Sequence, residues 1–391
     1  MKNHKTETTA SITHTHNDQE ITKKLLVIGA GTAGLAAIVG LRSFDKENKV
    51  EITLVEPKDF TEIVYASYRS PFEPWVAEGS LFSLDKFAKK YAVKHSRSIV
   101  TELTKDKAVL KDGTVMEFDV VLVATGAKMD WTGLGSGLPQ DHDGTHTDRL
   151  RAMKEAGDKV LKGSNILIVG GGLVGSELAG DVAVYAKRAG KTDVKVTLVH
   201  SQDHLCPEMY ESAARYLESK LRKVGVDIIL NDKVLEKDGK HVLQSNGKVL
   251  EADTVIKTVG YTTDSWFVKI EGALDAKGYL ASDDYFRVQG GDGKVFAYGD
   301  CCNTLAKRAI VHLDNMSIIG HNLWAALQGK SSNGDLKKGD PGMKVVMATA
   351  GPESGIVQFP WFYTQYLMPW VKNSTMAFFN SKSKLGIESF D

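Results

Sequence analysis

Two glycine-rich clusters have the spacing at which a backbone turn can hold phosphate groups. Residues 29–34 read Gly-Ala-Gly-Thr-Ala-Gly, and residues 170–175 read Gly-Gly-Gly-Leu-Val-Gly. In such a cluster the first glycine permits a tight turn, the second lets the backbone approach a pyrophosphate, and the third lets a helix pack closely against a strand. The first turn of that helix then offers unpaired N–H groups to the phosphates. The spacing therefore predicts two dinucleotide-binding turns.

The residue that follows the second strand of such a unit governs how a ribose is held. Glu56 ends the strand after the first cluster and is placed to accept hydrogen bonds from a ribose diol. After the second cluster the strand ends in His200, Ser201 and Gln202. That segment offers no carboxylate for an NAD ribose and no arginine obviously set for an NADP phosphate. NADH and NADPH both stay open, and tolerance of both is a hypothesis.

Each turn needs a strand that leads in, a helix that leads out and a second strand beside the first. Apolar runs and helical periodicity supply them. The expected strand, helix and strand are 25–28, 35–42 and 50–55 for the first turn, and 165–169, 176–188 and 194–199 for the second. The two units are an internal duplication of a domain.

The sequence around these units predicts further elements. Those expected are a polar loop (128–147), a helix (148–162), a helix (207–223), a strand (226–230), a helix (307–323), a linker (331–340) and a strand opening at 343–348.

Three strands that run into glycine turns extend the pattern along the chain. Residues 119–126 end in Ala-Thr-Gly, residues 254–260 end in glycine, and residues 295–300 end in Gly-Asp. Each alone is a plausible structural turn, but their order is hard to explain by chance.

With these turns, residues 24–327 resemble the two-dinucleotide-binding flavoprotein disulfide-reductase superfamily. The resemblance implies FAD at the first site and NADH or NADPH at the second. It also implies that Asp300 bonds the ribityl chain of FAD and that Thr125 and Gly126 lie near the join of the domains. The implied fold is α/β, with two Rossmann-like dinucleotide-binding domains of the glutathione-reductase type and a small C-terminal domain.

The same resemblance divides the chain. Residues 1–22 are expected to be a disordered tail. The expected FAD-binding domain is discontinuous (23–147 and 263–330), and the NAD(P)H-binding domain (148–262) interrupts it. Residues 331–391 form the C-terminal domain.

The cysteines do not fit a disulfide reductase. Cys206, Cys301 and Cys302 form neither CxxxxC nor CxxC. Thiol–disulfide chemistry beside a flavin needs a paired dithiol, so this activity is disfavoured. An odd number of cysteines also points to a reducing compartment.

Other segments are similar to the apoptosis-inducing-factor-like family, in its ferroptosis-suppressor branch. They are residues 56–60, 65–69, 200–202, 299–301 and 307–323. This resemblance implies oxidation of NAD(P)H with reduction of a quinone such as ubiquinone or vitamin K. Members are often anchored through a myristoyl group, but Lys2 stands where the acceptor glycine would be. The alanine-glutamine quinone motif of type II NADH dehydrogenases is not visible in 307–320.

Three residues are candidates for catalysis. Glu177 follows the second turn, where related enzymes place a glutamate against flavin and nicotinamide; the alternative is a helix-dipole acid. Arg69 is expected where the chain returns under the flavin ring; the alternative is a surface arginine. His312 could donate a proton to a quinone; the alternative is a packed helix histidine, on a helix expected to point its N-terminus at the flavin.

The residues expected to contact the cofactors are Gly29, Gly31, Thr32, Ala33, Gly34, Glu56, Pro57, Lys58, Arg69, Val100, Thr125, Gly126, Gly170, Gly172, Leu173, Val174, Gly175, Glu177, His200, Gly260, Asp300, Ala309 and Ile310. No metal site is expected.

Composition and charge narrow the partners and the compartment. The formal net charge is zero, which does not favour nucleic acid as a partner. No secretory signal opens the chain, so a cytoplasmic protein, or one peripheral to a mitochondrial or lipid-droplet membrane, is expected. The aromatic run 359–370 could contact a membrane, pack on the flavin domain or meet a second subunit.

Three functions follow from this sequence. The first is an NAD(P)H:quinone oxidoreductase. The second is a reductase of a ferredoxin-like protein, although no charge cluster stands out to dock one. The third is a redox-sensing signalling flavoprotein, in which NAD(P)H binding would shift the oligomeric state.

Overall fold

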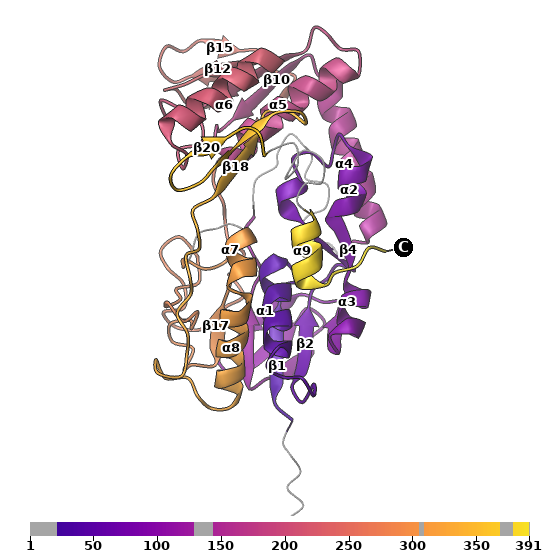
Figure 1. The fold of residues 1–391 in the computed structure, drawn as a ribbon, viewed down its shortest axis with the longest axis vertical. Helices are drawn as coiled ribbons and strands as arrows, with labels where there is room; N and C mark the ends of the chain where they lie inside the picture. Colours follow the sequence, from indigo (N-terminus) through magenta and orange to yellow (C-terminus); the bar gives the residue numbers. More distant parts are fainter. Residues whose placement is uncertain (1–21, 129–143, 305–308, 368–377, 391) are drawn as a thin grey trace, which may run out of the picture.

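The computed structural model describes residues 22–128, 144–304, 309–367 and 378–390. The expected tail lies outside these residues except for Thr22. Two parallel sheets, each with helices packed on one face, form the lower and upper halves of the molecule in Figure 1. No helix of the described residues is long and apolar enough to span a bilayer.

The first sheet has five parallel strands in the order β17-β9-β1-β2-β5. Its strands are β1 (Lys24–Ile28), β2 (Glu51–Val55), β5 (Val93–Ser96), β9 (Val120–Val123) and β17 (Val295–Ala297). Alternate residues of β1 face opposite sides of the sheet, as the pleat requires. Leu25 and Val27 pack with the helices of one face, and Leu26 and Ile28 pack with the small sheet of the other.

Helices cover the first of these faces. They are α1 (Thr32–Arg42), α7 (Ala309–Asp314), α8 (Met316–Leu327) and α9 (Phe378–Leu385). α1 and α8 cross with their backbones in contact. The approach is so close that a Cβ on Gly40 would overlap the carbonyl oxygen of Met316. The opposite face carries an antiparallel sheet of β6 (Val100–Leu103), β7 (Lys107–Leu110) and β8 (Val115–Glu117).

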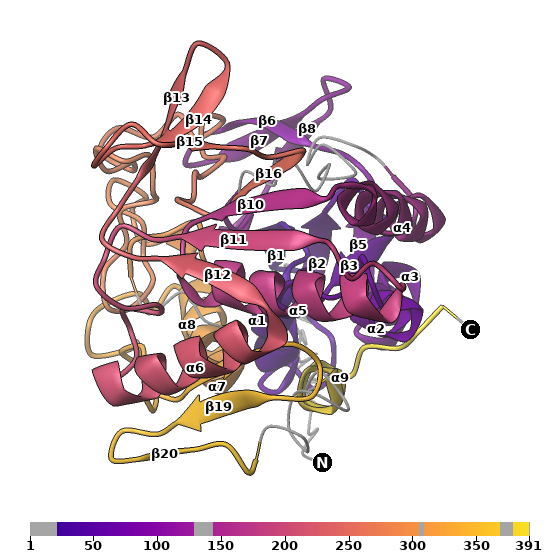
Figure 2. The same ribbon diagram turned by 90° about the horizontal axis from the view of Figure 1, so that it is seen from above.

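The second sheet has four parallel strands in the order β12-β11-β10-β16 (Figure 2). Its strands are β10 (Asn165–Val169), β11 (Lys195–Val199), β12 (Val226–Ile229) and β16 (Thr254–Lys257). α5 (Leu173–Arg188) and α6 (Glu211–Val224) bury one face. The other face meets a small antiparallel sheet of β13 (Val234–Lys237), β14 (Lys240–Leu243) and β15 (Val249–Leu250).

Short elements join the two sheets. The hairpin of β3 (Phe60–Glu62) and β4 (Leu81–Ser83) encloses the 3-10 turn η1 (Val64–Ala66) and α2 (Pro74–Ser80). α3 (Leu84–Lys90) follows the hairpin, and α4 (His146–Lys162) leads to the second unit.

The C-terminal segment contacts both units. Its sheet of β18 (Val346–Thr349), β19 (Gly355–Gln358) and β20 (Tyr363–Thr364) packs on α5 and α6 of the second unit. α9 packs on α1 of the first unit, and Lys86 of α3 donates to the carbonyls of Ser389 and Phe390. The segment therefore spans the two units along one side of the molecule (Figure 1).

Several element boundaries differ from the expected ones. α1 and α5 begin at Thr32 and Leu173, directly after the second glycine of each turn. The helix expected over 207–223 begins at Glu211, since Cys206 has a positive φ of 48° and starts a turn. The helix expected over 307–323 is broken at Asn315, whose side-chain amide donates to the carbonyls of Val311 and Asp340. The last expected strand begins later, at Val346.

Candidate functional site

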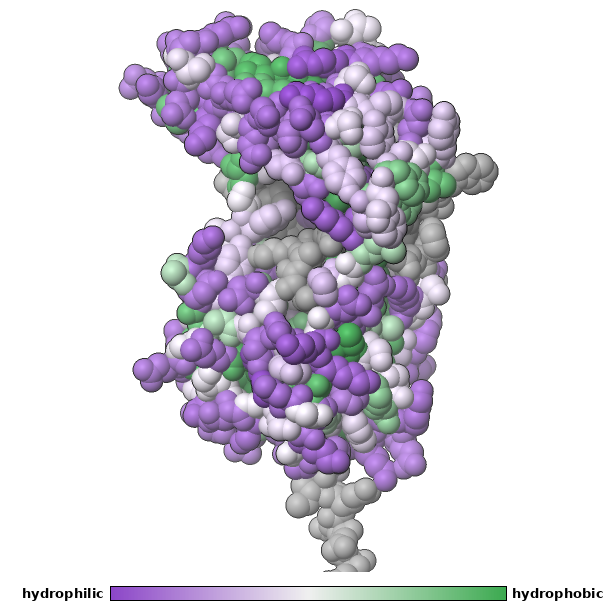
Figure 3. Space-filling view, turned by 60° about the vertical axis from the view of Figure 1, so that its left-hand side comes forward, coloured by the Kyte–Doolittle hydropathy of each residue, from purple (hydrophilic) through white to green (hydrophobic). Residues whose placement is uncertain are grey.

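A cavity of about 1910 Å³ lies where the two glycine turns face each other across the molecule. Its walls come from the ends of β1, β2 and β9, the first turn of α5, the segment after β16, α7 and the C-terminal residues 341–347. The surface is hollowed between the two halves in Figure 3. Carboxyl ends of parallel strands are where α/β folds place their ligands.

The first glycine turn is built for close approach by an external group. A Cβ on Gly29 or Gly34 would overlap the chain's own backbone, so packing demands both glycines. A Cβ on Gly31 would meet nothing within 4 Å. Gly31 is also the N-cap of α1, and no side chain caps the first N–H groups of that helix. The open space and uncapped amides fit a pyrophosphate.

The second turn repeats this arrangement. Gly170 and Gly175 are each required by close contact with the chain, whereas a Cβ on Gly172 would meet nothing within 4 Å. Gly172 is the N-cap of α5, again without a side-chain cap. In both turns the first and last glycines are required by packing, and the glycine at the helix N-terminus faces open space. The two turns therefore fit two dinucleotides.

Acidic and hydroxyl groups line the cavity beside the first turn. Glu56 is buried, and its carboxylate accepts a hydrogen bond of 3.0 Å from the Ala30 amide. Asp300 follows β17 and faces the same space. Among the described residues, the buried hydroxyl of Thr125 has no partner, so it is free to bond a ligand. This donor and acceptor set fits the sugar and ribityl hydroxyls of FAD.

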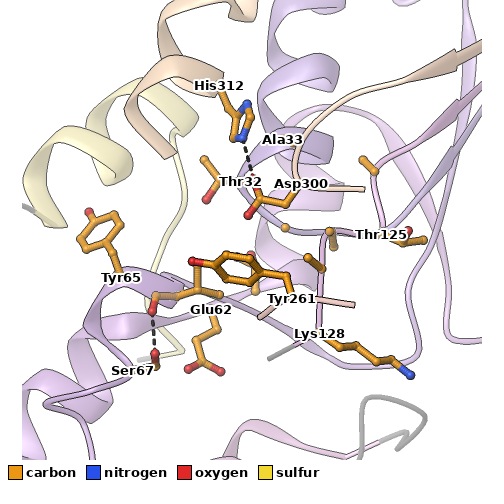
Figure 4. A pocket seen from close by; sticks show the side chains of 18 of the residues that line it. Thr32, Ala33, Glu62, Tyr65, Ser67, Thr125, Lys128, Tyr261, Asp300 and His312 are labelled. Atoms are coloured by element: carbon orange, nitrogen blue, oxygen red, sulfur yellow. Dashed lines mark hydrogen bonds and ion pairs between the residues drawn. The ribbon is translucent and has the colours of Figure 1, made fainter. Parts of the chain in front are cut away.

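His312 lines the cavity from α7, close to Asp300. Its Nε2 lies 3.3 Å from the Asp300 carboxylate, and its ring packs edge-on against Tyr298. The residue is 5% exposed, and its Nδ1 has no hydrogen-bond partner among the described residues. Figure 4 shows His312 and Asp300 on one side and Tyr65 on the other. The Asp300–His312 pair was not predicted from the sequence, since it depends on how α7 meets β17.

Glu177 reaches the cavity from the first turns of α5. Its Oε1 accepts three hydrogen bonds, at 3.2 Å from the Tyr68 hydroxyl and at 2.9 and 3.1 Å from the amide and hydroxyl of Thr349. Burial and the Glu177 carboxylate raise the pKa of the Tyr68 phenol well above its usual value. Glu177 thus stays oriented at the cavity wall, held by residues far away in sequence.

Arg69 does not take the position expected for it. It is 1% exposed, is not among the residues that line the cavity, and makes a bidentate pair with Asp181 at 2.9 and 3.1 Å. Burial is the largest single influence and opposes the charge, but Asp181 together with Tyr68 and Tyr185 outweighs it, so the pKa of the guanidinium is raised. Arg69 was expected as a cation directly under the flavin. It instead forms a buried ion pair with Asp181 of α5, which joins the two units.

The other expected residues divide into two groups. Those that line the cavity are Gly29, Gly31, Thr32, Ala33, Pro57, Lys58, Val100, Gly126, Gly172, Leu173, Val174 and Ile310. Those outside its lining are Gly34, Gly170, Gly175, His200 and Gly260. The side chain of Ala309 lies outside the described part of the structure.

Sequence reasoning did not single out several lining residues. They are Tyr65, Tyr68, Tyr261, Trp266, Lys344 and Met347. Tyr65 and Tyr68 lie in the segment 65–69 that carries a family resemblance, and Met347 lies in β18. No sequence pattern places any of the six at the cavity, because that depends on the folded chain.

The three cysteines are buried, and none lines the cavity. Burial raises the pKa of the Cys206 thiol, which makes it a poor nucleophile.

Comparisons with known proteins agree with this geometry. The family model described as pyridine nucleotide-disulphide oxidoreductase matches residues 23–318. Apoptosis-inducing factor homolog B of Dictyostelium discoideum is 26% identical over 357 residues, which cover 86% of this chain and 89% of the relative. Ferroptosis suppressor protein 1 of Xenopus tropicalis is 26% identical over 358 residues, which cover 86% and 88%. The expected resemblance is confirmed.

Solved structures share the fold. The sulfide:quinone oxidoreductase of Aquifex aeolicus superposes with a TM-score of 0.69 at 15% identity and covers 93% of this chain and 90% of its own. NDH2 of Plasmodium falciparum, in complex with NADH, gives a TM-score of 0.66 at 13% identity and covers 93% and 98%. The expected fold class is thereby confirmed. The chain belongs to the pyridine nucleotide-disulphide oxidoreductases and is an oxidoreductase that binds FAD and NAD(P)H.

Proposed function

We propose that this chain is an NAD(P)H:quinone oxidoreductase. The observation that carries the proposal is the lining of the cavity. Besides the glycine turns, it includes the aromatic and apolar side chains of Tyr65, Tyr261, Trp266, Val345 and Met347. Flat apolar acceptors are bound by walls of this kind.

The residues of the chain bind and orient, while the bound cofactors supply hydride and electron transfer. The N-termini of α1 and α5 hold the two pyrophosphates. Glu177, fixed by Tyr68 and Thr349, orients the group that binds against α5. His312, whose Nε2 lies 3.3 Å from the Asp300 carboxylate, is placed at the cavity wall to pass a proton to a reduced quinone.

The cysteines argue against a disulfide acceptor. A dithiol that receives electrons from a flavin must lie beside it. Among the described residues that line the cavity there is no cysteine, and Cys301 and Cys302 donate to backbone carbonyls next to β9 and β17 instead. A small-molecule acceptor is therefore the better match to this cavity.

Anaerobic flavin spectroscopy tests the proposal. NADH or NADPH is added to the FAD-loaded protein, and a short-chain ubiquinone analogue follows. We expect rapid bleaching near the flavin absorbance maximum and rapid recovery when the quinone is added. Bleaching without recovery would exclude the quinone and favour a protein acceptor or a redox sensor.

We also propose that the β19–β20 hairpin contacts a membrane surface, from which a lipid quinone would reach the cavity. Trp361 is 79% exposed and Tyr366 is 75% exposed. Phe362, Tyr363 and Leu367 are also exposed. Residues 368–370 of the aromatic run lie outside the described part of the chain. Aromatic side chains with polar edges favour the bilayer interface.

Sedimentation with anionic liposomes tests this contact. Serine at both Trp361 and Tyr366 should lower the bound fraction about fivefold or more, since it removes the apolar area that would enter the interface. Trp75→Ser on α2 is the matched control, because Trp75 is 42% exposed and belongs to another surface. Equal losses in the two variants, or no binding by the unmodified protein, would exclude the hairpin as a membrane contact.

A further inference from the structure

Thr349 is the residue through which the C-terminal sheet reaches Glu177. It ends β18, which packs beside α5 (Figure 1), and it is 0% exposed. A Cβ on Gly180 of α5 would overlap the amide nitrogen of Gly351, so the helix and the hairpin after β18 are in backbone contact. Glu177 lies one turn earlier on the same helix and lines the cavity. A segment outside both nucleotide units therefore contacts the cavity wall of the second.

The direction of the hydrogen bonds around Thr349 follows from the groups that surround it. The guanidinium of Arg69 can only donate, and its Nη2 lies 3.4 Å from the Thr349 hydroxyl oxygen. The single proton of that hydroxyl is donated to Oε1 of Glu177 at 3.1 Å. The Tyr68 phenol, whose pKa is raised by burial and by Glu177, keeps its proton and donates to the same oxygen at 3.2 Å. The Thr349 hydroxyl therefore links Arg69 to Glu177.

Three donors converge on one oxygen of Glu177. Besides the two hydroxyls, the backbone amide of Thr349 donates to Oε1 at 2.9 Å. Such supporting hydrogen bonds hold the carboxylate in one orientation before a nucleotide binds. Orientation matters for rate, because a misplacement of about 1 Å can slow a reaction about 100-fold. Thr349 does not line the cavity, so its effect on a bound nucleotide passes through Glu177.

We propose that Thr349 is a positioning residue of the nicotinamide half-reaction and that it sets the rate of flavin reduction through Glu177. A hydroxyl that accepts from a guanidinium is polarised and becomes a stronger donor to a carboxylate. Arg69 thus acts on the cavity at second remove, although it does not line it. The C-terminal sheet thereby serves the transfer of hydride into the flavin. The inference rests on the nicotinamide half of the proposed function and is independent of the acceptor.

Stopped-flow reduction of the FAD-loaded protein without oxygen tests the proposal, with whichever of NADH and NADPH reduces it faster. Thr349→Val removes the hydroxyl and keeps the backbone amide and nearly the same volume. It should lower the reduction rate at saturating nucleotide about tenfold, while the dissociation constant of the nucleotide changes less than about twofold. Thr349→Ser restores the hydroxyl and should bring the rate back to within about twofold of the unmodified protein. Circular dichroism and flavin content confirm that the variants are folded.

Two further variants separate positioning from general support of the fold. Tyr68→Phe removes the other side-chain donor to Oε1 and should slow reduction in the same way, which provides a second test if Thr349→Val loses flavin. In a Glu177→Gln background, Thr349→Val should change the rate less than about twofold, because the carboxylate that it positions is gone. A structural role of Thr349 would slow reduction equally in both backgrounds.

Thr254→Val is the matched control. Thr254 is 7% exposed, opens β16 and lies outside the cavity lining, so the reduction rate should stay unchanged. A Thr349→Val variant that is reduced as fast as the unmodified protein, or that slows equally with and without the Glu177 carboxylate, would overturn the inference alone. An unmodified protein that neither nucleotide reduces would overturn the proposed function and the inference with it. Reoxidation by a quinone plays no part in this measurement, so the acceptor is tested separately.

Discussion

Alanine at position 31 should deprive the protein of its flavin and leave its fold intact. A Cβ on Gly31 meets nothing of the protein within 4 Å, and the backbone there is extended. The methyl group would instead occupy the space in which a pyrophosphate approaches α1. Overpacking by a methyl group costs about 1–3 kcal/mol, which corresponds to about 5- to 150-fold weaker FAD binding. The measurements are flavin content after purification and FAD affinity of the apoprotein.

Two further glycines provide controls for this result. Gly34→Ala should destabilise the apoprotein, because its Cβ would overlap the carbonyl oxygen of Gly29. Gly172→Ala should retain FAD and weaken NAD(P)H instead, since Gly172 is the equivalent open position of the second turn. If Gly31→Ala bound FAD as tightly as the unmodified protein, the first turn would not be the pyrophosphate site.

Methionine at position 69 should be among the most destabilising substitutions in the chain. Asp181 is 0% exposed, and its carboxylate would lose both hydrogen bonds from the Arg69 guanidinium. Breaking a buried ion pair from one side typically costs about 3–5 kcal/mol, because the remaining buried charge loses its counter-ion. Urea denaturation of the FAD-free protein, followed by circular dichroism, measures the free energy of unfolding.

The control variants separate the buried charge from general damage. Arg69→Met combined with Asp181→Leu should be much less destabilised than Arg69→Met alone, since no charge is left buried. Arg188 lies on α5, the helix that also carries Asp181. Arg188→Met removes partly exposed ion pairs with Glu73 and Glu353 and should lower the free energy of unfolding by less than about 1 kcal/mol. Equal stability of the Arg69 single variant and the double variant would show that the ion pair does not hold the units together.

The nucleotide units were predictable because their information is local. The strand, the glycine turn and the helix of each unit are contiguous, and the apolar pattern of β1 and β10 marks buried strands. The helix starts lie only three residues before the expected ones, because each helix also includes the third glycine of its turn. The fingerprint prescribes this geometry regardless of what lies further along the chain.

The contacts that complete the site depend on long-range packing. Tyr68 and Glu177 are 109 residues apart, and Thr349 is 172 residues from Glu177. A single sequence contains no periodicity that pairs such positions. Arg69 was placed wrongly for this reason, since nothing near it in sequence indicates Asp181. The break at Asn315 also depends on Asp340, which a helical pattern over 307–323 cannot reveal.

The strand order of the first sheet also constrains the sequence of events on the ribosome. β17 completes the sheet by pairing with β9, yet it is made only after the entire second unit. The wholly apolar edge of β9 therefore stays unpaired while residues 124–294 emerge, and such an edge invites misassembly. The strands of the second sheet lie within residues 165–257, so the second unit can close before the first unit does. A substitution in β17 would therefore disturb the folding of the first unit only after the second unit has been synthesised.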